Sequence, residues 1–384
     1  MPTQGINILK NLVQHRLATI EAKGRLRSLR PLPRTQSRDI LDLTHNDYLG
    51  FRSDETFQTV ARKSAAAWPM GAGASRLLGG EHLIYEELEQ EFSAWKNCEA
   101  SLYFASGYAA NEALMSTLAL GDVTFFSDGL NHASLIDGLR LARIHPHQKI
   151  IFPHNNLSVL DEQLSLSQSE LKVVVTESLF SMDGDQAPLS EMLTLCRQHS
   201  ALLVVDEAHA LGVYGEQGSG LLSAHGLSAN EVVTINPCGK GMAAAGAFIS
   251  GPKWLRDYLI NTARSFIYST GASPWLAAGM LATLPLIRAA NDRRGHLANL
   301  SHTLRHDLQM IGCDVGRSTT HIIPLVLGSE EKSLQIEYKL REYGILARAI
   351  RPPTVAKGEC RLRFSLHAGI RDVDPVLNAL REIL

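Results

Sequence analysis

An acid, a histidine and a lysine in two separate segments have the side chains that a ring-shaped electron-sink cofactor needs. Asp206 ends the apolar run LLVVDEAH, and His209 follows three residues later. Lys240 lies in CGKGMAAAGAFISG, where small residues let a backbone and a ring approach closely. A pyridine ring that withdraws electrons keeps its nitrogen protonated beside a carboxylate, and the same kind of cofactor forms a Schiff base with a lysine.

A third segment has the features of a phosphate site. In FASGYAANEAL, Gly107 and Tyr108 follow an apolar run and open a helical pattern. The first amides of a helix bind phosphate well, because they have no partner inside the helix. Together with Asp206 and Lys240, these residues predict pyridoxal 5'-phosphate as the cofactor.

Two other interpretations of the first segment stay open at this point. Asp206 could cap the following turn, with His209 a hydrogen-bonded core histidine. Alternatively, DEAH could be the metal-holding box of an NTPase, which requires an upstream phosphate loop of the form GxxxxGK[ST]. The nearest candidate, NPCGKGM, lies downstream, with Thr234 in place of the first glycine and Gly241 in place of the Ser or Thr. Its order and spacing therefore disfavour the NTPase.

Composition excludes several classes of protein. The 384 residues are 45% hydrophobic, and 37 Lys plus Arg face 39 Asp plus Glu, so there is no global positive field for nucleic acid. The five cysteines are scattered without metal-ligand spacing, which predicts reduced thiols and no metal site. Without an apolar run of membrane length or a signal segment, we expect a cytoplasmic protein with no membrane partner.

The elements that must position these residues are short β-rich runs separated by helix-length stretches. Such runs occur at residues 101–104, 123–126, 149–152, 172–175, 202–205 and 246–250. Because they are apolar on both faces, they predict an α/β fold with a mostly parallel sheet covered by helices. Ligands bind beyond the carboxyl ends of such strands, which is where Asp206 lies.

The pattern changes near residue 285. HIIPLVLG, a helical stretch, GILARAI and CRLRFSL predict a smaller α+β domain. At the other end, apolar residues from Ile6 to Ile20 at helical spacing predict an amphipathic helix followed by a basic arm. We therefore expect an N-terminal helix and arm at 1–45, a large domain at 46–285 and a small domain at 286–384.

Many blocks of this sequence resemble the α-oxoamine synthases, a branch of the aspartate-aminotransferase fold. They run in order from about residue 40 to residue 367: NDYLGF, GAGASRLLGGEHLIYEELE, ASGYAAN, NHASLIDGLRLA, ESLFSMDGDQAPL, VVDEAHALGVYGEQGSG, CGKGM, IYST and AIRPPTV. The resemblance implies a fold-type-I pyridoxal-phosphate transferase with a large and a small domain. It also implies an acyltransferase that condenses an amino acid with an acyl thioester and releases CO2.

The resemblance implies a role for each cofactor residue. Lys240 would hold the cofactor and shuttle the proton at the amino-acid Cα, and Asp206 would stabilise the protonated ring nitrogen. His209 and Ser181 would reach the phenolic oxygen, and His132 of NHASLIDG would stack on the ring.

The same resemblance implies a shared phosphate site. Gly107 and Tyr108 would contact the phosphate within one subunit, and Ser269 and Thr270 of IYST would reach it from the neighbouring subunit. This implies a homodimer with shared active sites. The family usually has Thr three residues before the lysine, but this chain has Pro237, which has no donor. A lost bond to a charged group is worth about 1.5 to 3 kcal/mol, so we expect cofactor affinity to fall tenfold or more unless another donor compensates.

For the substrates, the resemblance implies Asn46 and Arg363 at the amino-acid carboxylate, and Arg27 and Thr354 at the acyl group. AIRPPTV and the short chain favour the branch that acts in biotin biosynthesis, with L-alanine and pimeloyl-CoA or pimeloyl-ACP as substrates. Relatives that use glycine or serine with acetyl, succinyl or long-chain thioesters share the core blocks, so this choice stays open. A folded relative without catalysis also stays open, because of Pro237.

Overall fold

The structure is a computed structural model that describes residues 3–27, 29 and 40–384. It divides into two compact units, Met1–Ile40 and Leu41–Leu384. In the first unit, the predicted amphipathic helix is present as α1 (Gln4–Ala22), and its apolar side chains, such as Leu9 and Leu12, are exposed. None of the helices within the described ranges is long and apolar enough to cross a membrane.

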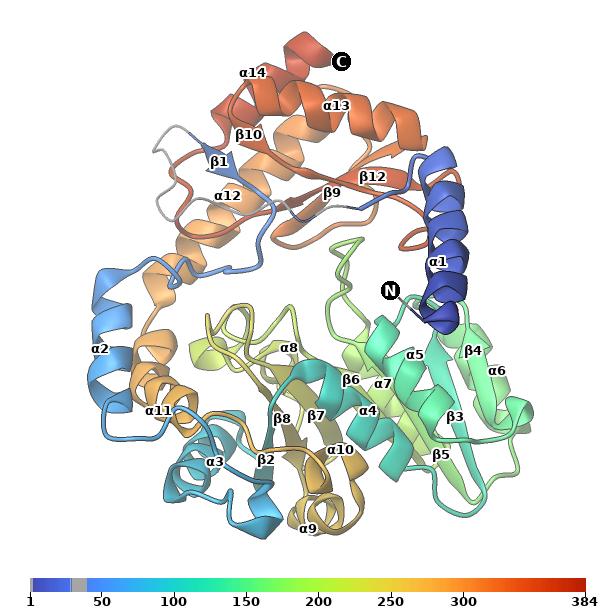
Figure 1. Cartoon of the computed structure of the whole chain (residues 1–384), viewed down its shortest axis with the longest axis vertical. Helices are drawn as coiled ribbons and strands as arrows, with labels where there is room; N and C mark the ends of the chain where they lie inside the picture. Colours follow the sequence, from blue (N-terminus) through green and yellow to red (C-terminus); the bar gives the residue numbers. More distant parts are fainter. Residues whose placement is uncertain (1–2, 28, 30–39) are drawn as a thin grey trace. The chain divides into compact units, whose positions relative to one another are not determined.

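The second unit is built on a seven-stranded sheet (Figure 1), in the order β2-β8-β7-β6-β5-β3-β4. The strands are β2 (Ala100–Phe104), β3 (Val123–Asp128), β4 (Lys149–Phe152), β5 (Leu171–Glu177), β6 (Ala201–Asp206), β7 (Val232–Pro237) and β8 (Ala247–Gly251). The pairs β2–β8 and β7–β8 are antiparallel and the other four pairs are parallel, so the predicted mostly parallel sheet is confirmed. Strand β7 was not expected, because Asn236 and Pro237 interrupt its apolar run.

Both faces of this sheet are buried, which explains its continuous apolar runs. Along β5, Val173 and Val175 pack on one face, with Leu114 of α4, while Val174 packs on the other, with Leu160 of α6. Alternate residues of a strand point to opposite faces, so each run must be apolar throughout. The helices along this part of the chain are α4 (Gly107–Thr117), α5 (Ala133–Leu141), η2 (Pro146–Gln148), α6 (Leu157–Leu166), α7 (Leu189–Gln198), η3 (Glu216–Gly218), α8 (Leu221–Ala224), α9 (Lys253–Thr262) and α10 (Arg264–Ile267).

Helices α2 and α3 pack with α11 around a third apolar cluster that includes Phe92 and Phe248, whose rings stack with centroids 3.8 Å apart. The elements of this part are α2 (Glu55–Ala65), η1 (Arg76–Leu78), α3 (Leu83–Lys96) and α11 (Pro274–Arg288). The block GASRLLGGE lies between α2 and α3, where Arg76 bonds to Glu89 at 2.5 Å.

A three-stranded antiparallel sheet, ordered β11-β12-β9, forms the C-terminal part, as the α+β pattern predicted. A separate parallel pair joins β1 to β10, so residues 41 and 42 lie beside a C-terminal strand. The elements are β1 (Leu41–Asp42), α12 (Asn291–Met310), β9 (Ile322–Gly328), α13 (Glu330–Glu342), β10 (Ile345–Leu346), β11 (Arg348–Ile350), β12 (Cys360–Ser365) and α14 (Asp374–Ile383). The boundary expected between residues 285 and 286 falls inside α11 and stays a prediction.

Candidate active site

Acidic residues end three neighbouring strands of the large sheet. Strand β3 ends at Asp128, β5 at Glu177 and β6 at Asp206. Glu177 and Asp206 are direct partners in the parallel register, and both are buried. Burial and the neighbouring Asp206 raise the pKa of Glu177 well above its usual value. The carboxyl edge of the sheet therefore holds three buried acids, of which the sequence analysis had placed only Asp206 there.

Both carboxylate oxygens of Asp206 accept hydrogen bonds. The Ala208 N–H donates to Oδ1 at 2.9 Å, so Asp206 does brace the following turn. Asn111 Nδ2 of α4 donates to Oδ2 at 2.8 Å. The capping interpretation is thus correct for one oxygen. The two donors hold the carboxylate in one orientation, which a site for a protonated ring nitrogen also needs.

The second hydrogen of the Asn111 amide extends this network to His132. Asn111 Nδ2 donates to Ser134 Oγ at 2.8 Å, and Ser134 Oγ lies 2.7 Å from His132 Nδ1. The Ser134 N–H also points at Nδ1, at 3.2 Å, so this nitrogen is an acceptor. Desolvation lowers the pKa of His132, which favours the neutral ring. The proton of His132 therefore belongs on Nε2.

Lys240 lies in the segment between β7 and β8. Small residues are required here, because a Cβ at Gly241 would clash with the carbonyl oxygen of Leu211. Gly241 therefore packs directly against the backbone of Leu211, and Lys240 Nζ lies 2.9 Å from His209 Nε2. The close approach of a cofactor ring to this backbone stays a prediction. Burial lowers the pKa of Lys240 to about 8, against the opposing charges of Asp206 and Glu177. A lysine with a lowered pKa supplies more of the neutral amine that acts as a nucleophile and base.

His209 is bonded through both ring nitrogens. Its Nδ1 lies 2.5 Å from the hydroxyl oxygen of Tyr48, and its Nε2 faces Lys240. Burial first, and then the positive charges of Lys240 and Arg363, lower the pKa of His209 well below its usual value. The ring is therefore neutral near pH 7. Tyr48 belongs to the block NDYLGF, but its side chain had no predicted role.

Arg363 of β12 reaches Asn46, with which the resemblance grouped it, and Ser181. Its Nη1 donates to Asn46 Oδ1 at 3.0 Å, and its Nε donates to the carbonyl oxygen of Ser181 at 2.5 Å. Ser365 Oγ also donates to Asn46 Oδ1, at 3.0 Å. Within the described residues, the buried Nη2 of Arg363 has no hydrogen-bond partner. A buried guanidinium nitrogen without an acceptor is suited to a carboxylate ligand.

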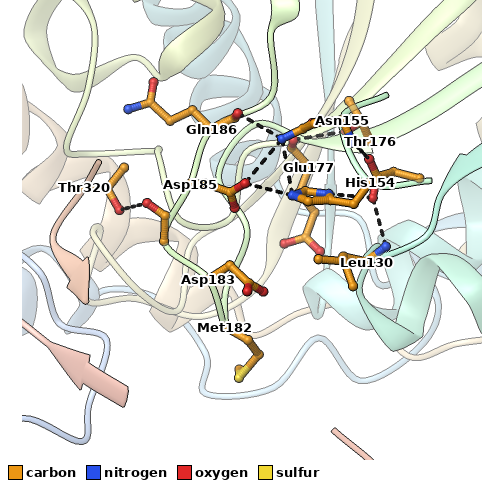
Figure 2. Close-up of polar contacts among 12 residues, drawn as sticks. Leu130, His154, Asn155, Thr176, Glu177, Met182, Asp183, Asp185, Gln186 and Thr320 are labelled. Atoms are coloured by element: carbon orange, nitrogen blue, oxygen red, sulfur yellow. Dashed lines mark hydrogen bonds and ion pairs between the residues drawn. The ribbon is translucent and has the colours of Figure 1, made fainter. Parts of the chain in front are cut away.

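The loop that carries Ser181, residues 178–187, is held in place by a charged cluster (Figure 2). His154 Nδ1 lies 2.9 Å from Asp128 Oδ1, and His154 Nε2 lies 2.8 Å from Asp185 Oδ2. These two carboxylates raise the pKa of His154 to about 9 against the effect of its burial. Asn155 Nδ2 also donates to the carbonyl oxygen of Gln186, at 3.2 Å. His154 is therefore a cation that ties this loop to the end of β3.

The opposite side of the same loop is bound to the small sheet. Arg361 Nη1 donates to Asp183 Oδ1 at 2.5 Å, and Thr320 Oγ1 donates to the carbonyl oxygen of Gly184 at 2.7 Å. The loop consequently connects strand ends of the large sheet to β12, the strand that carries Arg363. These contacts of the loop were not predicted from the sequence, although its segments 154–156 (HNN) and 183–185 (DGD) carry several of the polar residues that make them.

Gly107 opens α4, as expected, and Ser106 caps this helix by accepting from the Ala109 N–H at 3.1 Å. A Cβ at Gly107 would lie 2.8 Å from Cγ of Pro237, so only glycine fits beside the proline. Pro237 thus lies at the helix N-terminus and contributes no donor there. Tyr108 is exposed, and its hydroxyl donates to Asp137.

Ser269, Thr270, Thr354 and Arg27 have no described hydrogen bond to any other predicted site residue, apart from the one between Ser269 and Thr270. Ser269, Thr270 and Thr354 are exposed, and Ser269 Oγ donates to the neighbouring carbonyl of Thr270. Arg27 lies in the first unit, which is described by itself. Glu177 was missed, although it ends KVVVTE as Asp206 ends LLVVD. An acidic residue directly after an apolar strand run is the signal that could have identified Glu177.

Comparisons with known proteins agree with this fold. The sequence profile of the family described as Aminotransferase class I and II matches residues 38–380. An 8-amino-7-oxononanoate synthase of Anaeromyxobacter dehalogenans is 40% identical over 377 residues, 96% of this chain and 94% of that one. The chain therefore belongs to the aminotransferase class I and II family and, within it, to the 8-amino-7-oxononanoate synthases.

Solved structures show the same fold. An 8-amino-7-oxononanoate synthase from Francisella tularensis superposes with a TM-score of 0.78 at 26% identity, covering 90% of this chain and 97% of that one. A serine palmitoyltransferase from Sphingomonas wittichii superposes with a TM-score of 0.88 at 26% identity, covering 97% and 96%. The fold is that of the α/β transferases expected from the sequence.

Proposed function

We propose that this chain is a pyridoxal-phosphate-dependent acyltransferase that condenses L-alanine with a pimeloyl thioester. The products would be 8-amino-7-oxononanoate, CO2 and the free thiol, a step of biotin biosynthesis. The observation that carries the proposal is the desolvated amine of Lys240, 2.9 Å from His209 at the edge where the buried Asp206 ends β6. Membership of the 8-amino-7-oxononanoate synthases supports the choice of substrates.

The side chains at this edge fit the cofactor. Asp206 supplies a fixed carboxylate for the ring nitrogen, and Lys240 supplies the amine for its aldehyde carbon. His209 and Ser181 would serve the phenolic oxygen, while Gly107 and Tyr108 at the start of α4 would serve the phosphate. When bound, the cofactor would draw electrons from the amino-acid Cα, so that a proton or CO2 can leave.

Lys240 would take the proton from the Cα of alanine and later return one. A pKa of about 8 suits this task, since a base works best when its pKa lies near the working pH. His132 would pack on the ring face, and its chain of bonds through Ser134 and Asn111 to Asp206 would hold it there. Asn111 of α4 and Ser134 of α5 thus position the His132 ring.

Arg363 and Asn46 would bind the alanine carboxylate. The unpaired Nη2 of Arg363 supports this role, because a bound carboxylate would satisfy it. Arginine suits the task since its planar fork can donate two parallel hydrogen bonds. Arg27 and Thr354 at the acyl group, Ser269 and Thr270 reaching across a homodimer, and a cytoplasmic location remain parts of the proposal.

The test is a visible absorption spectrum of the purified protein with added pyridoxal phosphate, followed by borohydride reduction and peptide mapping. We expect a phosphopyridoxyl group on Lys240, and Lys253, an exposed lysine paired with Asp257, serves as the unmodified control. A protein that stays colourless with excess cofactor would overturn the proposal.

Substrate choice is tested by product analysis. Alanine, glycine and serine are each offered with pimeloyl-CoA and pimeloyl-ACP, and with acetyl-, succinyl- and palmitoyl-CoA. Formation of 8-amino-7-oxononanoate from alanine alone is the expected result. Faster turnover of glycine or serine with another thioester would assign the chain to a sister activity.

A further inference from the structure

The hydroxyl of Tyr48 makes a contact that the proposed mechanism has not used. It lies 2.5 Å from Nδ1 of His209, and neither residue is open to solvent, with exposed fractions of 0% and 4%. Tyr48 comes from the segment between β1 and α2, far from His209 in the sequence. The opposite nitrogen of the ring, Nε2, faces Lys240. If Tyr48 donates a hydrogen bond to Nδ1, a neutral His209 must carry its proton on Nε2. If Tyr48 accepts one, Nε2 has no proton.

The proton in this contact can lie on either side. Burial raises the pKa of Tyr48 to about 12, so its hydroxyl is protonated near pH 7. The charges and rings that face His209 are Lys240, Arg363, His321 and His132, and they disfavour a charged imidazole. A neutral imidazole has one N–H and one acceptor nitrogen. Either Tyr48 donates to Nδ1 and the ring proton is on Nε2, or Nδ1 donates to Tyr48 and Nε2 is bare.

The surroundings of Tyr48 favour the first arrangement. The positive charge of Arg363 lies close enough to lower the pKa of Tyr48, and a guanidinium can donate hydrogen bonds but cannot accept one. The neighbouring hydroxyl of Ser365 already donates its proton to Asn46 Oδ1. The Ser365 oxygen can still accept a hydrogen bond, but among the described hydrogen bonds the partner of the Tyr48 hydroxyl is Nδ1 of His209, at 2.5 Å. With Nδ1 accepting, the ring proton lies on Nε2.

We infer that Tyr48 is a positioning residue that donates its hydroxyl proton to Nδ1 of His209 and so keeps the His209 proton on Nε2, facing the phenolic oxygen of the cofactor. The second half of this inference rests on the proposed function. A neutral donor at Nε2 stabilises negative charge on that oxygen. It does so without adding a positive charge next to Lys240.

The direct test is nitrogen NMR at pH 9 of cofactor-free protein labelled with 15N-histidine, in which two-bond couplings distinguish the two ring tautomers. Lys240 Nζ lies 2.9 Å from Nε2 and can accept the Nε2 proton only as a neutral amine, above its pKa of about 8. His209 is assigned by its absence in His209→Gln. We expect the wild-type protein to show His209 protonated at Nε2, with the Nδ1 resonance shifted by an accepted hydrogen bond. In Tyr48→Phe that shift is lost. A wild-type His209 protonated at Nδ1 would overturn the inference.

Tyr214→Phe is the matched control. Tyr214 is partly buried against the same core, and its hydroxyl lies 3.2 Å from Nδ1 of His321, with no described bond to His209. We expect it to leave the His209 resonances unchanged. If Tyr214→Phe moved them as much as Tyr48→Phe does, the effect would be general loosening of the core and the inference would fail. Should Tyr48→Phe not fold, 3-fluorotyrosine at position 48 keeps the shape and strengthens the donor, so the Nδ1 shift must increase.

The cofactor-bound protein supplies a second readout. Losing the donor to the phenolic oxygen makes the conjugated imine more basic, so in Tyr48→Phe the pH midpoint of the visible band should rise by about 0.5 to 1 unit. Tyr214→Phe should keep the wild-type midpoint. If no variant, including wild type, takes up pyridoxal phosphate, the proposed function fails while the NMR result still decides the role of Tyr48. If all three bind it with one midpoint, the inference fails and the proposed function stands.

Discussion

Two histidines at the carboxyl edge of the large sheet each have two hydrogen-bond partners, but the charges around them have opposite signs. His209 is bonded through both ring nitrogens, to Tyr48 and Lys240, and His154 is bonded through both, to Asp128 and Asp185. The pKa of His209 is lowered well below its usual value, whereas that of His154 is raised to about 9. One ring is a neutral donor and the other is a fixed cation.

The difference shows that a buried histidine takes its charge from its partners and not from burial alone. Desolvation lowers the pKa of both rings. Two carboxylates more than offset it at His154, while Lys240 and Arg363 add to it at His209. The neutral ring lies at the proposed chemistry and the charged ring braces the loop that carries Ser181. Substitutions should therefore damage activity near the first and stability near the second.

The largest expected effect is a difference in kcat/KM between variants of two arginines of β12. Arg363→Lys removes the planar fork beside His209, so kcat/KM for alanine should fall by about 100-fold or more, mostly through KM. Arg361→Lys, two residues away and bonded to Asp183 of the braced loop, should change kcat/KM less than about fivefold. Steady-state kinetics with alanine as the varied substrate measures both. Equal losses in the two variants would contradict the division between them.

A smaller effect is expected at the charged histidine. His154→Gln leaves the buried Asp128 and Asp185 without their cation, and the free energy of unfolding should fall by about 2 kcal/mol at pH 7. His199→Gln is the control, because its partner Asp161 is 53% exposed, and it should cost less than about 0.5 kcal/mol. Urea unfolding at constant ionic strength measures both. A loss at position 154 no greater than that at position 199 would refute the brace.

The smallest effect is in pH dependence, and its sign differs between the two rings. For His154 the folded pKa is raised, so its contribution is complete below about pH 6.5 and is lost as pH rises through about 9. After allowance for solvent screening, the stability difference between wild type and His154→Gln should shrink by about 1 kcal/mol over that range.

For His209 the folded pKa is lowered, so the opposite trend is expected. Its contribution to stability is present above about pH 6.5 and is lost as pH falls toward its folded pKa. The stability difference between wild type and His209→Gln should therefore shrink on acidification. Urea midpoints from pH 5 to pH 9 measure both trends. Parallel slopes for the two variants would mean that the rings carry the same charge.

Much of the fold could be predicted from the sequence because its signals are local. Apolar runs such as KVVV and LLVV mark strands buried on both faces, and residues 171–177 and 201–206 are indeed strands. Strand β7 was missed since its run ends in Asn236 and Pro237. The expected position of Gly107 at the start of α4 is confirmed. It could be predicted because a glycine after a strand and before a helical pattern is also a local signal.

The sequence by itself determined which side chains are available at the sheet edge: an acid that ends β6, and a lysine among residues small enough to pack closely. Only the tertiary structure decided what state they are in. Tyr48 and His209 are separated by 161 residues, and His154 meets carboxylates 26 and 31 residues away. A pKa depends on burial and on charges within a few ångströms, and those distances exist only once the chain has folded.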